Sequence, residues 1–192
     1  QTAAPPVNEH LMELCMLLDA LKHASARRIT AVIPYYFYVR SDKKDMPRIS
    51  ITARLVADLL ATAGANRVLT MTLHSEQIQG FFNMPADHLS AIPLVCDYFS
   101  DWDLSDFVVV APDAGSARRA GAYASRLDLP MAIGDKRRLS DSEVIIDSVV
   151  GNVEGKKVLI FDDEIATGGS MLKLARYLHD NCGVEELYAG AA

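Results

Sequence analysis

Short apolar runs alternate with amphipathic segments along the whole chain. Residues 8–23 place Leu11, Leu14 and Leu18 on one face at helical spacing, and Asn8 is the expected N-cap of this helix. Brief runs such as residues 107–111 are apolar throughout, which is typical of strands that a parallel sheet buries on both faces. The pattern predicts helices over 8–23, 51–63, 94–100, 116–127 and 170–180, and strands over 29–34, 67–73, 107–111, 131–134, 158–161 and 186–189. Such alternation predicts an α/β fold with mostly parallel sheets flanked by helices.

Two stretches interrupt the alternation. Residues 35–50 carry many charged and aromatic side chains and are too long for an ordinary turn, which indicates a functional loop. Residues 86–93 are the expected crossover between two domains, so we expect the chain to divide into 1–90 and 91–192. A chain of 192 residues is long enough for two small domains, each with its own core.

The composition limits the function classes. A hydrophobic fraction of 50% and a charged fraction of 23% are those of a soluble globular protein. The net charge of −6 argues against a general nucleic-acid binder, because binding to phosphates needs a surplus of Lys and Arg. No apolar run approaches the roughly 20 residues of a membrane helix. We therefore expect neither a nucleic-acid polymer nor a membrane as partner. Cys15, Cys96 and Cys182 lie far apart in sequence, which indicates reduced thiols in a cytoplasmic protein.

The strongest local motif is residues 157–170, where a buried strand runs through an acidic end and a small-residue turn into a helix. A turn of this kind presents backbone N–H groups at the positive end of the helix, which suits a phosphate. Asp162 and Asp163 follow the strand and can accept hydrogen bonds from sugar hydroxyls or from a metal-bound water. Since adjacent strand residues alternate, we expect only one of them to face the ligand. The alternative is a turn whose Gly and Thr serve geometry and capping alone.

Three further features are ambiguous when taken singly. Residues 135–138 follow a predicted strand and contain Lys-Arg-Arg, which on its own is typical of a solvated surface. Asp113 precedes Gly115 and Ser116 at the start of a predicted helix, which indicates either a second anion-binding turn or the mere beginning of a turn. His74 is a single histidine, and such residues are more often structural than functional.

Together these segments resemble, in chain order, the signature segments of the ribose-phosphate pyrophosphokinase family, whose members make phosphoribosyl diphosphate (PRPP). The segments are 35–45, 69–82, 109–120, 135–138 and 157–170. The resemblance covers nearly the whole chain, and the family's enzymes are longer. It therefore implies two domains of the type I phosphoribosyltransferase fold, both cut short in this chain. It also implies a reaction, in which the pyrophosphoryl group of ATP passes to C1 of ribose 5-phosphate to give PRPP and AMP for nucleotide biosynthesis.

The resemblance also implies roles for particular residues. Catalysis would fall to Lys136 and Arg138, acting from a mobile loop that stabilises charge on the phosphates. ATP would be bound by Arg40, Ser41, Asp42 and His74, and Mg²⁺ by His74 and Asp113. Ribose 5-phosphate would be bound by Asp162, Asp163, Ala166, Thr167, Gly168, Gly169 and Ser170. The chain departs from the family pattern at four positions, where the family usually has other residues: Ser41 (glutamine), Thr72 (aspartate), Ala166 (aspartate) and Ser170 (threonine).

Three other functions compete with PRPP synthesis. A phosphoribosyltransferase would use the same loop to consume PRPP, and Ala166 also occurs in adenine phosphoribosyltransferases, but those enzymes lack the segments around Arg40, His74 and Lys136. A non-catalytic regulatory relative would have lost the cations Lys136 and Arg138. A purely structural module does not explain five segments in order. The resemblance further implies a homo-oligomer built from dimers, up to a hexamer.

Overall fold

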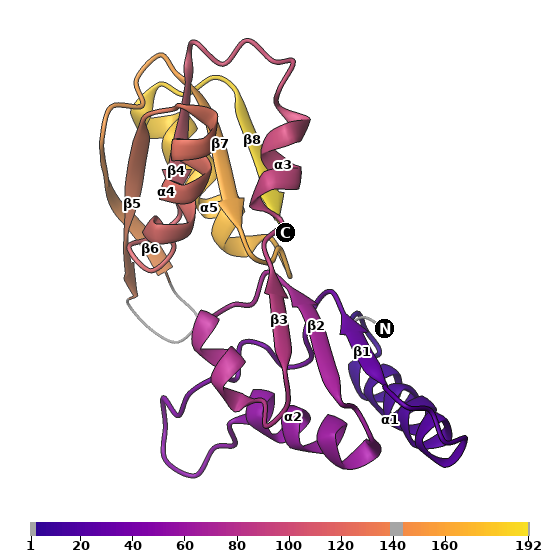
Figure 1. Cartoon of the computed structure of the whole chain (residues 1–192). Helices are drawn as coiled ribbons and strands as arrows, with labels where there is room; N and C mark the ends of the chain where they lie inside the picture. The colour runs from indigo at the N-terminus through magenta and orange to yellow at the C-terminus, as the bar shows by residue number, and fades with distance from the viewer. Residues whose placement is uncertain (1–2, 139–143, 192) are drawn as a thin grey trace. The chain divides into compact units, whose positions relative to one another are not determined.

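The computed structural model describes residues 3–138 and 144–191, with the backbone alone over 136–138 and 144–147. The chain forms two compact units, Gln1–Ala91 and Ile92–Ala192, and each has its own sheet (Figure 1). Among the described residues, none of the helices is both long enough and apolar enough to cross a bilayer.

The first unit is built on a three-stranded parallel sheet in the order β1-β2-β3. Its apolar core includes Leu18, Ile33, Phe37, Val56 and Leu60, which come from helices, strand and loop alike. The elements are α1 (Val7–His23), β1 (Thr30–Ile33), α2 (Thr52–Ala63), β2 (Arg67–Met71), the 3₁₀ helix η1 (Glu76–Phe81) and β3 (Ala86–Leu89).

The second unit is built on a five-stranded sheet in the order β6-β5-β4-β7-β8. Strands β5, β4, β7 and β8 are parallel, and β6 pairs antiparallel with β5. Val109 and Phe161 pack in a core with α3 and α4, while Val110 and Ile160 pack with α5. The elements are α3 (Ile92–Tyr98), β4 (Phe107–Ala111), α4 (Ala117–Leu127), β5 (Met131–Arg138), β6 (Val144–Val150), β7 (Lys157–Asp162), α5 (Gly169–Cys182) and β8 (Leu187–Ala191).

The predicted α/β fold with mostly parallel sheets flanked by helices is confirmed. Asn8 is not the N-cap of the first helix, because the helix starts one residue earlier, after Pro6, and the Asn8 side chain instead accepts a hydrogen bond from the Tyr38 hydroxyl. The predicted crossover at 86–93 contains strand β3, which pairs with β2 before the chain passes into the second unit.

The basic segment 135–138 is not a loop, and this expectation was wrong. It forms the second half of β5, where Lys136 is the register partner of Ile146 and Arg138 that of Val144. The register shifts between Asp135 and Lys136, as at a β-bulge. The alternation of strands with helices predicts that a helix follows each strand. It therefore did not predict β6, which follows β5 in the chain and pairs antiparallel with it.

Gly151 directly follows β6 and has a backbone conformation that residues with side chains rarely adopt. Its φ is +125°, and an added Cβ would lie 2.6 Å from the Cβ of Ala132. We expect Gly151→Ala to lower the free energy of unfolding of this unit by about 2–4 kcal/mol, the sum of backbone strain and overpacking. Urea unfolding followed by the fluorescence of Trp102, the only tryptophan, measures it.

Gly155→Ala is the matched control for that measurement. Gly155 also has a positive φ, +66°, but an added Cβ would meet nothing within 4 Å. The control isolates the strain of a left-handed residue, roughly 1–2 kcal/mol. Equal losses in the two variants would show that the contact with Ala132 costs nothing.

Candidate functional site

One edge of the second sheet gathers most of the predicted site residues. Strands β4, β5 and β7 are parallel neighbours, with Ala111 opposite Ile133 and Val110 opposite Ile160, so their carboxyl ends lie at the same edge. Asp113 follows β4 and the acidic turn follows β7, while β5 continues past this edge through Lys136 and Arg138. Ligands of open α/β sheets bind at such an edge, outside the carboxyl ends of the strands.

An arginine joins the two adjacent carboxylates at the end of β7. The Nη1 atom of Arg119 lies 3.1 Å from Oδ1 of Asp162 and 2.6 Å from Oδ1 of Asp163. Alternation along a strand would point neighbouring side chains to opposite faces, but these two carboxylates reach the same nitrogen, and the prediction that only one of them faces the ligand stays untested. Asp162 is the last residue of β7, so the chain leaves the strand before Asp163 and both side chains reach the same nitrogen.

The two carboxylates have different environments. Asp163 is buried, with its side chain 7% exposed, whereas the Asp162 side chain is 30% exposed. Burial, followed by the hydrogen bond with Asp163, raises the pKa of Asp162 to about 6, although the Asp163 backbone N–H and the Arg119 charge act in the opposite direction. Asp162 is therefore the more accessible group for a ligand, and it titrates just below neutral pH.

The turn after this pair leads into α5 through a glycine that needs its conformational freedom. Gly168 has a φ of +72° at the N-cap of α5, and its carbonyl accepts the Leu172 N–H at 2.8 Å. Ala166, Thr167, Gly169 and Ser170 around it are exposed. Within the turn, the Gly169 N–H makes a long hydrogen bond of 3.5 Å to Thr167 Oγ1. Exposed backbone N–H groups at a helix start fit a phosphate.

Asp113 begins the turn into α4. Its Oδ1 accepts the Ser116 N–H at 3.0 Å, and the Ser116 hydroxyl accepts the Asp113 N–H at 3.1 Å. These two hydrogen bonds start the turn, which was the alternative to a functional role for Asp113. Magnesium ligation by Asp113 stays a prediction, and it is chemically compatible, because Mg²⁺ is commonly held by one or two carboxylates with several waters.

In the first unit, the segment 35–50 is fastened to the start of α2 by Ser41. The Ser41 hydroxyl accepts the Thr52 N–H at 3.1 Å and donates to the Ser50 carbonyl at 3.1 Å. Arg40 beside it is exposed, and Asp42 is half-buried. The hydroxyl at position 41 therefore holds the backbone of the predicted ATP-binding segment, while its predicted contact with ATP stays untested.

His74 is exposed and follows a turn that a second histidine supports. The Leu73 N–H donates to Nε2 of His88 on β3 at 3.0 Å, and the Ala91 N–H donates to the hydroxyl of Thr72 at 3.3 Å. Strands β1 and β2 are parallel, so the segments that follow them, 35–50 and 72–75, leave the sheet at the same edge. At this edge the Met71 N–H donates to the Pro34 carbonyl at 3.1 Å. His88 could not be found from the sequence, because its contact with Leu73 depends on the pairing of β2 with β3.

His88 accepts a hydrogen bond only as the neutral imidazole, which makes its titration testable. Burial lowers its pKa, against a smaller opposing effect of Glu76. Because folding lowers the pKa of His88, its hydrogen bond with Leu73 stabilises the fold fully above about 6.5, the pKa in the unfolded chain. This stabilisation is lost as the pH falls through the lower pKa of the folded state. We expect an NMR titration of the His88 ring to show a midpoint below about 6.5, and the Leu73 amide signal to move with it.

His88→Gln is the control, because a glutamine oxygen can accept the Leu73 N–H without titrating. In this variant the Leu73 amide signal should no longer follow the pH over that range. A ring midpoint at or above the usual histidine value would contradict the neutral acceptor.

No group of three or more His, Cys, Asp or Glu side chains suited to a metal ion occurs among the described residues. The two predicted magnesium residues belong to different units, His74 to the first and Asp113 to the second. Ligation of Mg²⁺ by His74 and by Asp113 therefore stays a prediction for each unit by itself.

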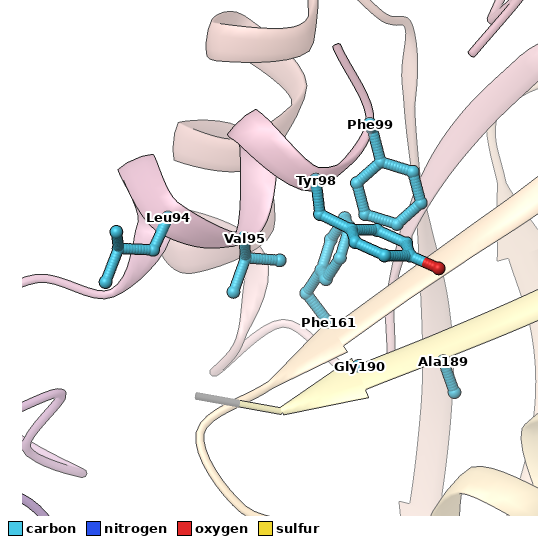
Figure 2. A pocket seen from close by; sticks show the side chains of 7 residues that line it. All are labelled: Leu94, Val95, Tyr98, Phe99, Phe161, Ala189 and Gly190. Atoms are coloured by element: carbon cyan, nitrogen blue, oxygen red, sulfur yellow. The ribbon is translucent and has the colours of Figure 1, made fainter. Parts of the chain in front are cut away.

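The second unit also has a pocket of about 360 Å³, whose lining differs in chemistry from the polar carboxyl edge of its sheet (Figure 2). It lies between α3 and strands β7 and β8, and its lining is apolar or aromatic: Leu94, Val95, Tyr98, Phe99, Phe161, Ala189 and Gly190. Phe161 directly precedes Asp162 but takes part in the core with α3 and α4. Such a lining offers no cation and suits a sugar phosphate poorly.

Two family models match different parts of this chain. The N-terminal domain of ribose phosphate pyrophosphokinase matches residues 1–64, and the phosphoribosyl transferase domain matches residues 91–190. Ribose-phosphate pyrophosphokinase of Deinococcus radiodurans is 54% identical over 98% of this chain, and that of Bacillus caldolyticus is 50% identical over 98%. This chain spans 59% and 60% of their lengths.

The same family emerges from solved structures. The crystal structure of phosphoribosylpyrophosphate synthetase from Mycobacterium smegmatis matches with a TM-score of 0.92 and 42% identity, over 100% of this chain and 62% of that one. The relatives are longer than this chain, as the sequence resemblance implied.

Proposed function

Because the chain belongs to the ribose-phosphate pyrophosphokinase family, we propose that the protein transfers the pyrophosphoryl group of ATP to the C1 hydroxyl of ribose 5-phosphate, with release of AMP and PRPP. The observation that carries the proposal is that similarity to these synthetases runs through both units. A phosphoribosyltransferase that only consumes PRPP would share the fold of the second unit and its loop, and not the segments around Arg40 and His74.

The sugar phosphate would bind at the carboxyl edge of the second sheet. The turn at Thr167–Ser170 would hold the 5-phosphate through backbone N–H groups and hydroxyls, which are donors that an exposed helix start supplies. Asp162 would accept hydrogen bonds from the ribose hydroxyls, since it is the more exposed carboxylate of the pair. These contacts would fix the orientation of C1 for the transfer.

Catalysis would consist mainly of positioning and charge stabilisation. In the transfer, the C1 oxygen forms a bond to the β-phosphorus of ATP, the bond from that phosphorus to the α,β-bridging oxygen breaks, and the C1 hydroxyl loses its proton. Negative charge on the phosphoryl oxygens would be stabilised by Lys136 and Arg138, which the β5–β6 pairing carries beyond the sheet edge. Bound Mg²⁺ would neutralise part of the ATP charge, and His74 in the first unit and Asp113 in the second are each proposed as a residue that would hold such an ion.

ATP would be bound by the first unit, through Arg40, Ser41, Asp42 and His74. An exposed guanidinium such as that of Arg40 suits both phosphate pairing and stacking on adenine. We further infer a homo-oligomer, by analogy with the family, and a cytoplasmic location, which fits the free thiols of Cys15, Cys96 and Cys182.

Phosphorus NMR of the purified protein with ATP, Mg²⁺ and ribose 5-phosphate tests the proposal. Joint appearance of AMP and PRPP is the expected result. If neither forms, PRPP supplied with adenine distinguishes the transferase, which would release pyrophosphate and AMP, from a protein without either activity. Either of those outcomes would overturn the proposed synthetase.

A further inference from the structure

Arg119 joins two segments of the second unit that lie far apart in sequence. It belongs to the first turn of α4, which starts after the Asp113–Ser116 turn at the end of β4. Its Nη1 atom contacts both carboxylates at the end of β7, and its side chain is only 19% exposed. A guanidinium so enclosed is screened weakly by solvent, so removing it would leave the carboxylates uncompensated, which costs more than breaking a surface ion pair.

The face of α4 that carries Arg119 is rigidly packed. Tyr123, one helical turn further on, is 1% exposed and stacks on Phe161 with ring centres 4.0 Å apart. Arg119 and Tyr123 are four residues apart in α4 and so lie on the same face of the helix, and the Arg119 charge lowers the pKa of Tyr123 against the larger effect of burial. Phe161 directly precedes Asp162 in β7. The stacking therefore fixes the helix face and the strand end to each other.

The carboxylate pair needs a cation to remain in this arrangement. Two carboxylates one residue apart repel each other, and burial of Asp163 increases that repulsion. The charges acting on Asp162 are those of Asp163 and Arg119. Its register partner on β8 is the uncharged Ala191, and on the β4 side the chain continues to Asp113, whose carboxylate accepts the Ser116 N–H.

We propose that Arg119 is a positioning residue for the sugar site, which holds Asp162 and Asp163 in one arrangement so that Asp162 accepts the ribose hydroxyls. This inference rests on the proposed function, because it assumes that the sugar binds at this pair. It assigns Asp163 to structure and Asp162 to the ligand.

The test compares Arg119→Met, which removes the charge but keeps most of the volume, with Arg119→Lys, which keeps a charge. For Arg119→Met we expect the KM for ribose 5-phosphate to rise about 10- to 100-fold, as is usual when the group that orients a ligand is lost, with the KM for ATP changed less than about threefold. Arg119→Lys should recover part of the loss, since a single nitrogen makes both contacts. Arg118→Met, an exposed neighbour, is the matched control.

A second readout, the titration of the Asp162 carboxyl, does not depend on activity, and a purely structural role of Arg119 would not change it. Carbon NMR of the Asp162 carboxyl in the substrate-free protein should give a midpoint near 6 in the native chain, and a higher one in Arg119→Met, because the guanidinium lowers it. An unchanged midpoint together with an unchanged sugar KM would overturn the inference. A shifted midpoint in a protein that makes no PRPP would leave the positioning of the pair intact and reject the proposed reaction instead.

Discussion

Lys136→Ala should lower kcat for PRPP formation about 10²- to 10³-fold, while the KM for ribose 5-phosphate stays within about twofold. A cation that contacts charge developing on the transferred group stabilises the transition state more than the bound substrates. The loss therefore falls on the rate of the chemical step. Steady-state kinetics with varied ribose 5-phosphate at saturating ATP measures both quantities.

The β5–β6 pairing makes Lys136 a good test of position as well as of charge. Its backbone lies directly after the register shift at Asp135, opposite Ile146. Lys136→Arg, which keeps the charge in a different shape, should recover only part of the rate. Lys156→Ala is the matched control, since Lys156 pairs with Asp106, whose side chain is 72% exposed, and such pairs contribute about 0–1 kcal/mol. Unchanged turnover in Lys136→Ala would remove this residue from the mechanism.

Asp162→Asn should raise the KM for ribose 5-phosphate about 10- to 100-fold, with a smaller effect on kcat. Asparagine keeps the shape but replaces one acceptor oxygen with a donor, so hydroxyl groups that donated to the carboxylate lose an acceptor. Because Asp163 keeps its contact with Arg119, we expect the fold of the edge to survive. Kinetics with varied ribose 5-phosphate, supported by a thermal unfolding curve, measures the change.

The pH dependence gives the same variant a second outcome. The pKa of Asp162 is about 6, so the accepting, ionised form predominates above that pH and is lost as the pH falls through it. The native protein should therefore show an acid limb in kcat/KM for the sugar near this value, and Asp162→Asn should lack it. Asp106→Asn changes an exposed carboxylate of the same unit and should leave both features intact. Native sugar kinetics in Asp162→Asn would refute its role.

Much of the fold could be predicted from local pattern. Strand β4 is apolar at each position because both faces of the sheet are covered, and a run of this kind is readable in one dimension. Strands β3 and β6 were not predicted for different reasons. Residues 86–89 are partly polar and short, and residues 144–150 pair antiparallel with β5, a partner choice that alternation does not specify.

The candidate site divides in the same way. Asp113 and the Asp162–Ser170 turn could be located from sequence, because the carboxyl ends of parallel strands meet at one edge. The contact of Arg119 with both carboxylates could not, because it depends on where β7 ends and how α4 packs on Phe161. The support of the Leu73 backbone by His88 likewise depends on the pairing of β2 with β3.

The sequence by itself determined the order of most helices and strands, the family, and which residue types with the chemistry for a sugar phosphate are present. These depend on the periodicity of apolar side chains and on short motifs, both of which are local along the chain. Only the tertiary structure decided which carboxylate is accessible, which cation holds the pair, and that residues 135–138 lie in a strand. Each of these depends on contacts between residues distant in sequence, and burial and charge act through space and not along the chain.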